Sequence, residues 1–239
     1  MNFRQFLNEK YRDEITLEEA VKIFKGKCKN VDLENGVLYR GSYSNYVDYN
    51  ILTGEEGERK SANTANHYTK IIDHNLKGTD YPLRSKSIIC STEIDYARNY
   101  SAADPLVLIP FDGVKIGVCA RNDMWLTKAK FDGTTMDVVE LNELYGIVGV
   151  KDDSFETIVD GIEKAVKAGK RLISWLFTDD KSVKEQLEDA YSIENLGFSL
   201  IENKDISKLK GSRECWVGGS CLAIEWSKFE EFKKLVDKS

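Results

Sequence analysis

The sequence predicts an α+β fold, because segments with helical and with strand patterns follow one another without regular βαβ alternation. A helix is indicated most clearly between Ser154 and Gly169, where apolar residues recur at helical spacing. Short apolar runs at 87–91 and 106–109 are typical of strands. Neither an internal repeat nor a Gly/Ser-rich or Pro-rich linker divides the 239 residues, so we expect a single domain, 1–239.

Helix start signals and apolar spacing add further helices. Thr16 with Glu19 forms a capping box, and similar boxes follow later in the chain. The segments that these patterns predict as helices are 17–25, 60–74, 93–100, one that begins after Ser182 and one that begins after Ser227. We therefore expect an N-terminal helical part in 1–35 and a helical insertion at about 150–195.

Apolar runs at 37–40 and 116–119 predict two more strands. The apolar segment 172–177 fits either a strand or a buried helix. We expect Trp175, which lies in that segment, and Trp216 to belong to the core. Residues 120–150 have no pattern that favours one structure.

Gly218 and Gly219 separate two short apolar strands and predict a tight β-hairpin. In the register of such a hairpin, Glu214 lies opposite Ala223 and shares a face of the sheet with Trp216. A small residue opposite the glutamate would leave room for a ligand.

Composition excludes several classes of protein. The formal net charge of −6 argues against general nucleic-acid binding, although a nucleic acid could still be held in a small basic cleft. No apolar run approaches the roughly 20 residues of a membrane span. The first residues lack a signal-peptide pattern, so we expect a cytoplasmic protein without a membrane partner. Five irregularly spaced cysteines favour reduced, buried thiols.

Motifs for phosphate-loop, dinucleotide-fold and metal chemistry are absent from the sequence. His67 and His74 have no nearby third ligand, so we expect packing or surface roles for them and no bound metal. Catalysis would therefore depend on carboxylates, hydroxyls and arginines.

Three short elements offer those groups. They are Arg40 followed by Gly41 at a strand end, Ser91 and Thr92 at the end of the strand 87–91, and Glu214 where a loop enters a strand. Their order, and the helix that follows the second, resemble the arginine, Ser-Thr-Ser and glutamate motifs of the toxin-type mono-ADP-ribosyltransferases. Segments 59–69 and 84–87 are also similar to a group of uncharacterised tailed-phage proteins. The resemblance implies an ADP-ribosyltransferase-like split, mainly antiparallel β-sheet core with surrounding helices and a helical insertion.

The resemblance further implies that NAD is the substrate. Arg40 would bind the pyrophosphate with two parallel hydrogen bonds. Glu214 would bind a ribose hydroxyl and offset the positive charge that develops as nicotinamide leaves, while Ser91 orients that glutamate. An aromatic ring, Tyr100 or Phe111, would pack on the nicotinamide. The expected catalytic residues are Glu214, Ser91 and Arg40, and the expected NAD-binding residues are Arg40, Gly41, Ser91, Thr92, Tyr100 and Arg84.

The chain departs from the family pattern at two positions. Ser212 stands where arginine-modifying members have Glu or Gln, and Glu93 replaces the last serine of the second motif. The long gap before Glu214 implies an insertion, or else a different catalytic glutamate, Glu140 or Glu143.

Simpler roles are open for each of these residues. Arg40 could form a surface ion pair, Ser91 and Thr92 could cap the following helix, and Glu214 could be a solvated edge-strand charge. The basic residues near Arg84 could form an ordinary charged face or a basic rim for NAD phosphates or a nucleic acid. These basic residues are Arg59, Lys60, Arg84 and Lys86.

The function that the sequence predicts is transfer of ADP-ribose from NAD to a macromolecular acceptor, a protein or a nucleic acid. The phage resemblance implies a host component as the acceptor and the cytoplasm of the infected host as the location. With water as acceptor, the same chemistry would be that of an NAD glycohydrolase. The alternative is a fold that has lost activity and sequesters a nucleotide or a host defence factor.

Overall fold

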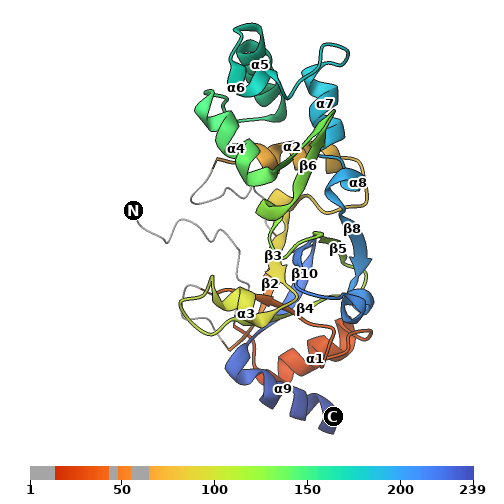
Figure 1. The fold of residues 1–239 in the computed structure, drawn as a ribbon. Helices are drawn as coiled ribbons and strands as arrows, with labels where there is room; N and C mark the ends of the chain where they lie inside the picture. The colour runs from red at the N-terminus through yellow and green to blue at the C-terminus, as the bar shows by residue number, and fades with distance from the viewer. Residues whose placement is uncertain (1–13, 43–47, 55–64) are drawn as a thin grey trace.

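A computed structural model of the chain describes residues 14–42, 48–54 and 65–239 (Figure 1). Its central sheet has eight strands in the order β2-β10-β4-β1-β3-β9-β5-β8. Every neighbouring pair in that sheet is antiparallel. A separate pair, β6 and β7, forms a small second sheet. The predicted α+β class and the mainly antiparallel sheet are therefore confirmed.

The elements have the following bounds. The strands are β1 (Leu38–Arg40), β2 (Tyr49–Thr53), β3 (Ile88–Ser91), β4 (Leu106–Pro110), β5 (Lys115–Val118), β6 (Lys128–Phe131), β7 (Thr134–Asp137), β8 (Ser199–Glu202), β9 (Glu214–Val217) and β10 (Ser220–Glu225). The helices are α1 (Leu17–Lys27), α2 (His67–Leu76), α3 (Ile94–Arg98), α4 (Val138–Ile147), α5 (Phe155–Lys167), α6 (Arg171–Ser174), α7 (Val183–Ala190), α8 (Ile193–Leu196) and α9 (Trp226–Lys238). Short 3-10 turns are η2 (Arg84–Lys86), η3 (Met124–Leu126) and η4 (Asn203–Lys208).

The predicted helix starts agree with the structure at two of the three capping boxes. Thr16 caps α1 and Ser182 caps α7, each with the reciprocal bond from the glutamate three residues on. The third box, at Ser227, was wrong. The strand β10 runs directly into α9 at Trp226, whose backbone N–H donates to the carbonyl of Pro105. No loop residue precedes α9 that could cap it with a side chain.

The segment 172–177, for which the sequence allowed either a strand or a buried helix, begins in the short helix α6. The prediction that Trp175 lies in the core was wrong, because its side chain is 56% exposed and its indole N–H donates to the carbonyl of Leu172. Ile173 and Leu176 fill the core instead, since they occupy the inward side of the same turn.

The predicted hairpin at Gly218 and Gly219 was also wrong. Strand β9 pairs with β3 and β5, whereas β10 pairs with β2 and β4. Neither glycine has a positive φ, which a hairpin turn of the expected type requires. A Cβ on Gly218 would lie 2.4 Å from the Cβ of Pro82, and one on Gly219 would lie 2.8 Å from the side chain of Val114. Close packing explains both glycines, and Glu214 therefore does not face Ala223.

The large sheet is covered on both faces. On one face, helices α1 and α9 pack against β4 and β10 through a core that includes Val107, Leu222 and Phe232. Trp216 lies on that same face farther along the sheet and joins the core of the helices α2, α4, α5, α7 and α8. On the opposite face, Cys90, Cys215 and their neighbours pack beneath η4.

The helices α2, α4, α5, α6 and α7 gather at one end of the molecule, away from α1 and α9 (Figure 1). The predicted insertion at about 150–195 covers α5 to α8 of this helical lobe. The lobe also contains α2, α4 and the β6–β7 hairpin, which precede residue 150. His67 and His74 both pack inside it, since His67 bonds to the carbonyl of Val150 and His74 stacks on Phe155.

Candidate functional site

Strands β1, β3 and β9 are neighbours, and each carries one of the three motifs singled out in the sequence. Tyr39 is the cross-strand partner of Ser91, and Ser91 is the partner of Glu214. Directly opposed residues of antiparallel strands point to the same face, so Ser91 and Glu214 share a face. Arg40 follows Tyr39 and therefore leaves the sheet on the opposite face.

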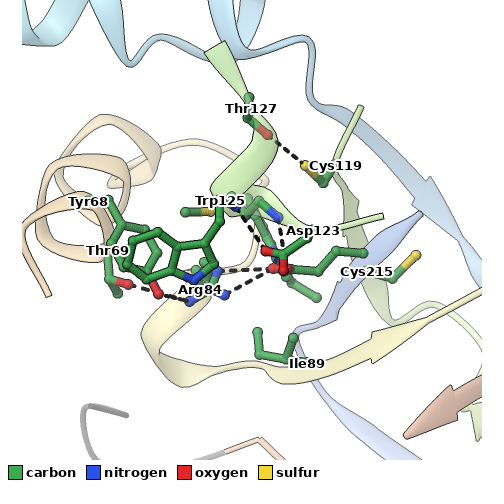
Figure 2. A network of polar contacts seen from close by, with 12 residues as sticks. Tyr68, Thr69, Arg84, Ile89, Cys119, Asp123, Trp125, Thr127 and Cys215 are labelled. Atoms are coloured by element: carbon green, nitrogen blue, oxygen red, sulfur yellow. Dashed lines mark hydrogen bonds and ion pairs between the residues drawn. The ribbon is translucent and has the colours of Figure 1, made fainter. Parts of the chain in front are cut away.

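Glu214 is held by four hydrogen bonds. Figure 2 shows its partner Arg84 beside Tyr68 and Thr69. Its Oε1 accepts from Arg84 Nε at 3.1 Å, from Arg84 Nη2 at 3.0 Å and from the indole Nε1 of Trp216 at 2.7 Å. Its Oε2 accepts from the backbone N–H of Met124 at 3.1 Å. The residue is only 7% exposed and lies on an interior strand, so it is not the solvated edge-strand charge that the sequence left open.

Arg84 forms a buried ion pair with Glu214. Its Nη1 donates to the hydroxyls of Tyr68, at 3.3 Å, and Thr69, at 3.4 Å, and the guanidinium also lies over the Tyr68 ring. Burial by itself would lower the pKa of Arg84, but the Tyr68 hydroxyl, Glu214 and Asp73 raise it above its usual value. Arg84 therefore stays charged. Its N–H groups are bonded to protein acceptors, so it does not contribute to the basic rim that the sequence left open.

Three parts of the chain come together around this ion pair. Tyr68 and Thr69 belong to α2, Met124 begins η3, and Arg84 begins η2. The turn η2 is itself fixed to α2, because Asp73 accepts a hydrogen bond from the backbone N–H of Ser85. The network thus joins the helical lobe to the central sheet.

The hydroxyl of Ser91 lies beside Glu214 but has a different partner. Ser91 Oγ accepts from the backbone N–H of Glu93 at 3.0 Å, just before α3 begins. The prediction that Ser91 and Thr92 cap this helix was wrong, because the N-cap residue of α3 is Glu93 and it has no side-chain cap hydrogen bond. Within the described residues, no hydrogen bond joins Ser91 to Glu214.

Thr92 fixes the loop that leads into Glu214. Its hydroxyl donates to the carbonyl of Gly211 at 3.1 Å and accepts from the backbone N–H of Arg213 at 2.9 Å. The backbone N–H of Thr92 also donates to the carbonyl of Arg213. Thr92 therefore holds the segment 211–213, which leads into β9.

Arg40 is buried, so it is not the surface ion-pair residue that the sequence left open. Its Nη1 donates to the carbonyl oxygen of Ile89 on β3. Gly41, the next residue, lies against the end of α3: a Cβ there would be 2.4 Å from the carbonyl oxygen of Tyr100 and 2.8 Å from that of Ala97. Gly41 is thus required by close packing of the backbone.

Tyr100 follows α3 and is 47% exposed. Its hydroxyl lies 3.3 Å from that of Tyr96, and both hydroxyls lie within reach of Asp123, with the Tyr96 bond at 2.8 Å. Burial, and then the contacts with Tyr100 and Asp123, raise the pKa of Tyr96. Because Asp123 precedes Met124, this cluster adjoins the Glu214 network. Phe111 does not, since it packs near Lys27 at the α1 side of the sheet.

The remaining candidates lie elsewhere. Glu140 completes a capping box at the start of α4, and Glu143 is exposed on the same helix. Lys86 is exposed on η2, while Arg59 and Lys60 lie outside the described residues. All five cysteines are buried and free, as a chain of reduced thiols requires.

Sequence reasoning missed three groups around Glu214. These are Trp125, whose ring contacts Tyr68 at a centroid distance of 4.7 Å, the backbone N–H of Met124 and the carboxylate of Asp123. Trp216 was expected on the face of Glu214, because it follows two positions later on the same strand, but its hydrogen bond to the carboxylate was not predicted. The η3 residues fall in the segment that had no readable pattern.

In the described ranges, no three His, Cys, Asp or Glu side chains are grouped so that they could hold a metal ion. Over the same ranges, no helix combines the length and the apolar character needed to cross a membrane. Comparisons of this chain with protein-family models, with curated protein sequences and with solved structures give no match.

Proposed function

We propose that the chain is a mono-ADP-ribosyltransferase-like protein that cleaves NAD and transfers ADP-ribose to a macromolecular acceptor, a protein or a nucleic acid. The observation that carries the proposal is the register of Ser91 and Glu214, which are direct partners on neighbouring strands. Arg40 ends β1, the strand next to β3, so the three motifs lie on neighbouring strands. Ser91 and Glu214, which are 123 positions apart in the sequence, therefore lie side by side in the sheet.

The carboxylate of Glu214 is suited to one further hydrogen bond. A carboxylate offers about four acceptor positions, two on each oxygen. Oε1 already takes three N–H groups, while Oε2 takes only the backbone N–H of Met124. A ribose hydroxyl of NAD would donate to Oε2, and the fixed carboxylate would be held in place while positive charge grows on the ribose.

In the proposed reaction, the bond between the ribose anomeric carbon and the nicotinamide nitrogen breaks, and its electron pair leaves with nicotinamide. A lone pair of the acceptor nucleophile forms the new bond to that carbon, and the acceptor loses its proton. Arg40 leaves β1 on the opposite face of the sheet, so its guanidinium would bind the pyrophosphate only from beyond the end of the strand, after its bond to the Ile89 carbonyl is broken. Arg84 supports Glu214 in this scheme and is not a phosphate ligand.

The similarity of segments 59–69 and 84–87 to tailed-phage proteins extends the proposal to the biological setting. The protein would act in the cytoplasm of an infected bacterium on a host protein or a host nucleic acid. The net charge of −6 favours a protein acceptor over a long nucleic acid, because a polyanion is repelled by an acidic surface.

A second candidate function is supported by the ion pair itself. Arg84 lies 3.0 Å from Glu214 and brings a positive charge to the group that would have to stabilise a cationic transition state. A carboxylate neutralised in this way is less effective electrostatically than a free one. The same fold could therefore bind NAD or another nucleotide without cleaving it.

Nicotinamide release from labelled NAD, with and without bacterial lysate, distinguishes the two functions. For the transferase, Glu214→Gln reduces release by about 100-fold or more, because one group that stabilises transition-state charge is lost. Glu231→Gln is the matched control, since Glu231 is an exposed glutamate on α9, and it should leave release unchanged.

The fate of the label separates the remaining outcomes. Label that enters protein or nucleic acid supports transfer and identifies the acceptor class, whereas release without transfer identifies a glycohydrolase. NAD binding without release, equal in the wild type and in Glu214→Gln, supports the binding protein. Absence of both binding and release would eliminate NAD as the ligand.

A further inference from the structure

A pocket of about 350 Å³ lies where β5 and β8 meet. Its lining residue Val118 points to the face of the sheet opposite to Glu214, because Val118 is the cross-strand partner of Cys215. Its walls come from the end of β5 at 118–120, from the start of β8 at Ser199 and from the segment that follows η4. That segment contributes Lys208, Lys210 and Arg213. Arg213 immediately precedes Glu214, so the two side chains leave β9 and its lead-in on opposite faces.

The lining of this pocket is basic in an acidic protein. Three of its nine residues are Lys or Arg and none is Asp or Glu, although the whole chain has a net charge of −6. Lys208 is partly neutralised from outside the pocket by Asp205, at 2.6 Å. Lys210 and Arg213 have no carboxylate partner among the described residues. Positive potential is therefore concentrated at this pocket.

The guanidinium of Arg213 is fixed at the wall of the pocket. Its Nε donates to the carbonyl of Lys210 at 3.2 Å and its Nη1 donates to the carbonyl of Ala120. The third nitrogen, Nη2, has no protein acceptor in the described part of the chain. A guanidinium that is anchored by two nitrogens loses little side-chain entropy when the third binds an anion.

We propose that this pocket binds the phosphate group of a small phosphorylated molecule, such as a nucleoside monophosphate. Arg213 Nη2, the Lys210 ammonium and the Ser199 hydroxyl supply charged and neutral donors that match phosphate oxygens. A volume near the lower end of the usual range for small-ligand pockets fits a mononucleotide rather than a polymer. None of the residues proposed to bind NAD lines the pocket, so the inference does not depend on the proposed function.

Titration of the protein with inorganic phosphate and with adenosine monophosphate tests the proposal, followed by backbone amide shifts and by calorimetry. We expect the largest shifts at Ser199 and in 208–213, and weaker binding at higher ionic strength. Lys210→Gln should weaken the binding of both probes about tenfold, because one charged donor is lost.

Lys204→Gln is the matched control, since Lys204 is also an exposed lysine near η4 but does not line the pocket. Its binding should equal that of the wild type. Equal weakening by both substitutions, shifts centred on Ser91 and Glu214, or no binding of either probe would each overturn the proposal.

The variant Glu214→Gln keeps this test independent of NAD chemistry. If the phosphate site is on the opposite face, phosphate affinity is unchanged in Glu214→Gln even where nicotinamide release is lost. A parallel loss of phosphate binding in that variant would show a single site and would contradict the inference. Tighter binding of the mononucleotide than of phosphate supports a nucleoside monophosphate, and equal affinity supports recognition of phosphate alone.

Discussion

Glu214, the first residue of β9, and Arg213, which precedes the strand, differ in how far their polar groups are already bonded within the protein. Glu214 is buried with four hydrogen bonds, and its partner Arg84 directs four N–H groups at protein acceptors. Among the described residues, one nitrogen of Arg213 has no protein acceptor and Lys210 has no ion pair. Arg84 and Arg213 carry the same charge near the same strand, but within the described ranges only Arg84 has protein acceptors for all three of its nitrogens.

Whether the N–H groups of a cation already have protein acceptors distinguishes a structural cation from a ligand-binding one better than its position in the sequence does. Arg84 was expected among the NAD-binding residues, as part of a possible basic rim for the NAD phosphates. Its donors instead satisfy Glu214, Tyr68 and Thr69 inside the protein. Arg213 was not among the expected binding residues, yet it lies at the pocket wall and its Nη2 has no acceptor within the part of the chain that the structure describes.

The largest expected effect follows from removal of Arg84. Arg84→Met should lower the free energy of unfolding by about 3–5 kcal/mol, because Glu214 would be left buried without its counter-charge. Urea unfolding of the wild type and the variant measures this difference. The double variant Arg84→Met/Glu214→Gln should recover part of the loss, since neither charge is then unpaired.

Lys86→Met is the control for Arg84, because Lys86 lies on the same turn η2 but is exposed. Its effect should stay within about 0.5 kcal/mol of zero. An Arg84 variant as stable as the Lys86 variant would contradict the buried ion pair.

The second effect concerns Cys119, which lies close to Glu214 and whose thiol contacts the Thr127 hydroxyl (Figure 2). Burial, and then the Glu214 carboxylate, raise the pKa of Cys119 from 9.0 to about 11. Below pH 9.0 both the folded and the unfolded chain keep the thiol proton, so the full contribution to stability is present. As the pH rises toward about 11, the unfolded chain releases the proton first and that contribution is lost.

Each difference of one in pKa corresponds to about 1.4 kcal/mol, so the alkaline loss from Cys119 is on the order of 3 kcal/mol. The stability difference between the wild type and Cys119→Ala, followed by urea unfolding across this pH range, should therefore shrink as the pH rises. In Glu214→Gln the loss should be smaller and should end at lower pH, because without the negative charge near the thiol the folded-state pKa of Cys119 is raised less. A difference that is constant with pH would show that Cys119 is accessible to solvent.

Local patterns in the sequence predicted local structure well. The capping boxes at Thr16 and Ser182 depend only on neighbouring residues, and both exist in the structure. The strand at 87–91 and the helix after Ser154 likewise follow from short apolar periodicity. Such elements are determined mainly by residues within one or two turns.

Pairing between distant strands could not be predicted in this way. The glycines at 218 and 219 read as a turn because sequence alone does not show that Pro82 and Val114 lie against them. With the hairpin, the prediction that Glu214 faces Ala223 also failed. The neighbour of Glu214 is Ser91, which only the tertiary arrangement of β3 and β9 reveals.

The candidate site was predicted in part. Proximity of Ser91 and Glu214 could be expected from the order of the motifs, and the structure has them as cross-strand partners. The partners of Glu214 could not, because the N–H of Met124 and the side chain of Arg84 come from turns without a sequence pattern. Burial of a charge depends on contacts that are distant in sequence, whereas motif residues are recognised one at a time.

The smallest expected effect on stability is that of removing Lys210, whose charge has no partner in the described part of the chain. Lys210→Gln should change the free energy of unfolding by less than about 0.5 kcal/mol, because an exposed lysine without an ion pair stabilises little. Arg213→Gln should cost about 1–3 kcal/mol, since the carbonyls of Ala120 and Lys210 would lose their donor. Urea unfolding without phosphate measures both. A Lys210 variant that is clearly destabilised would make this lysine a structural residue like Arg84, and its charge would then no longer indicate a ligand.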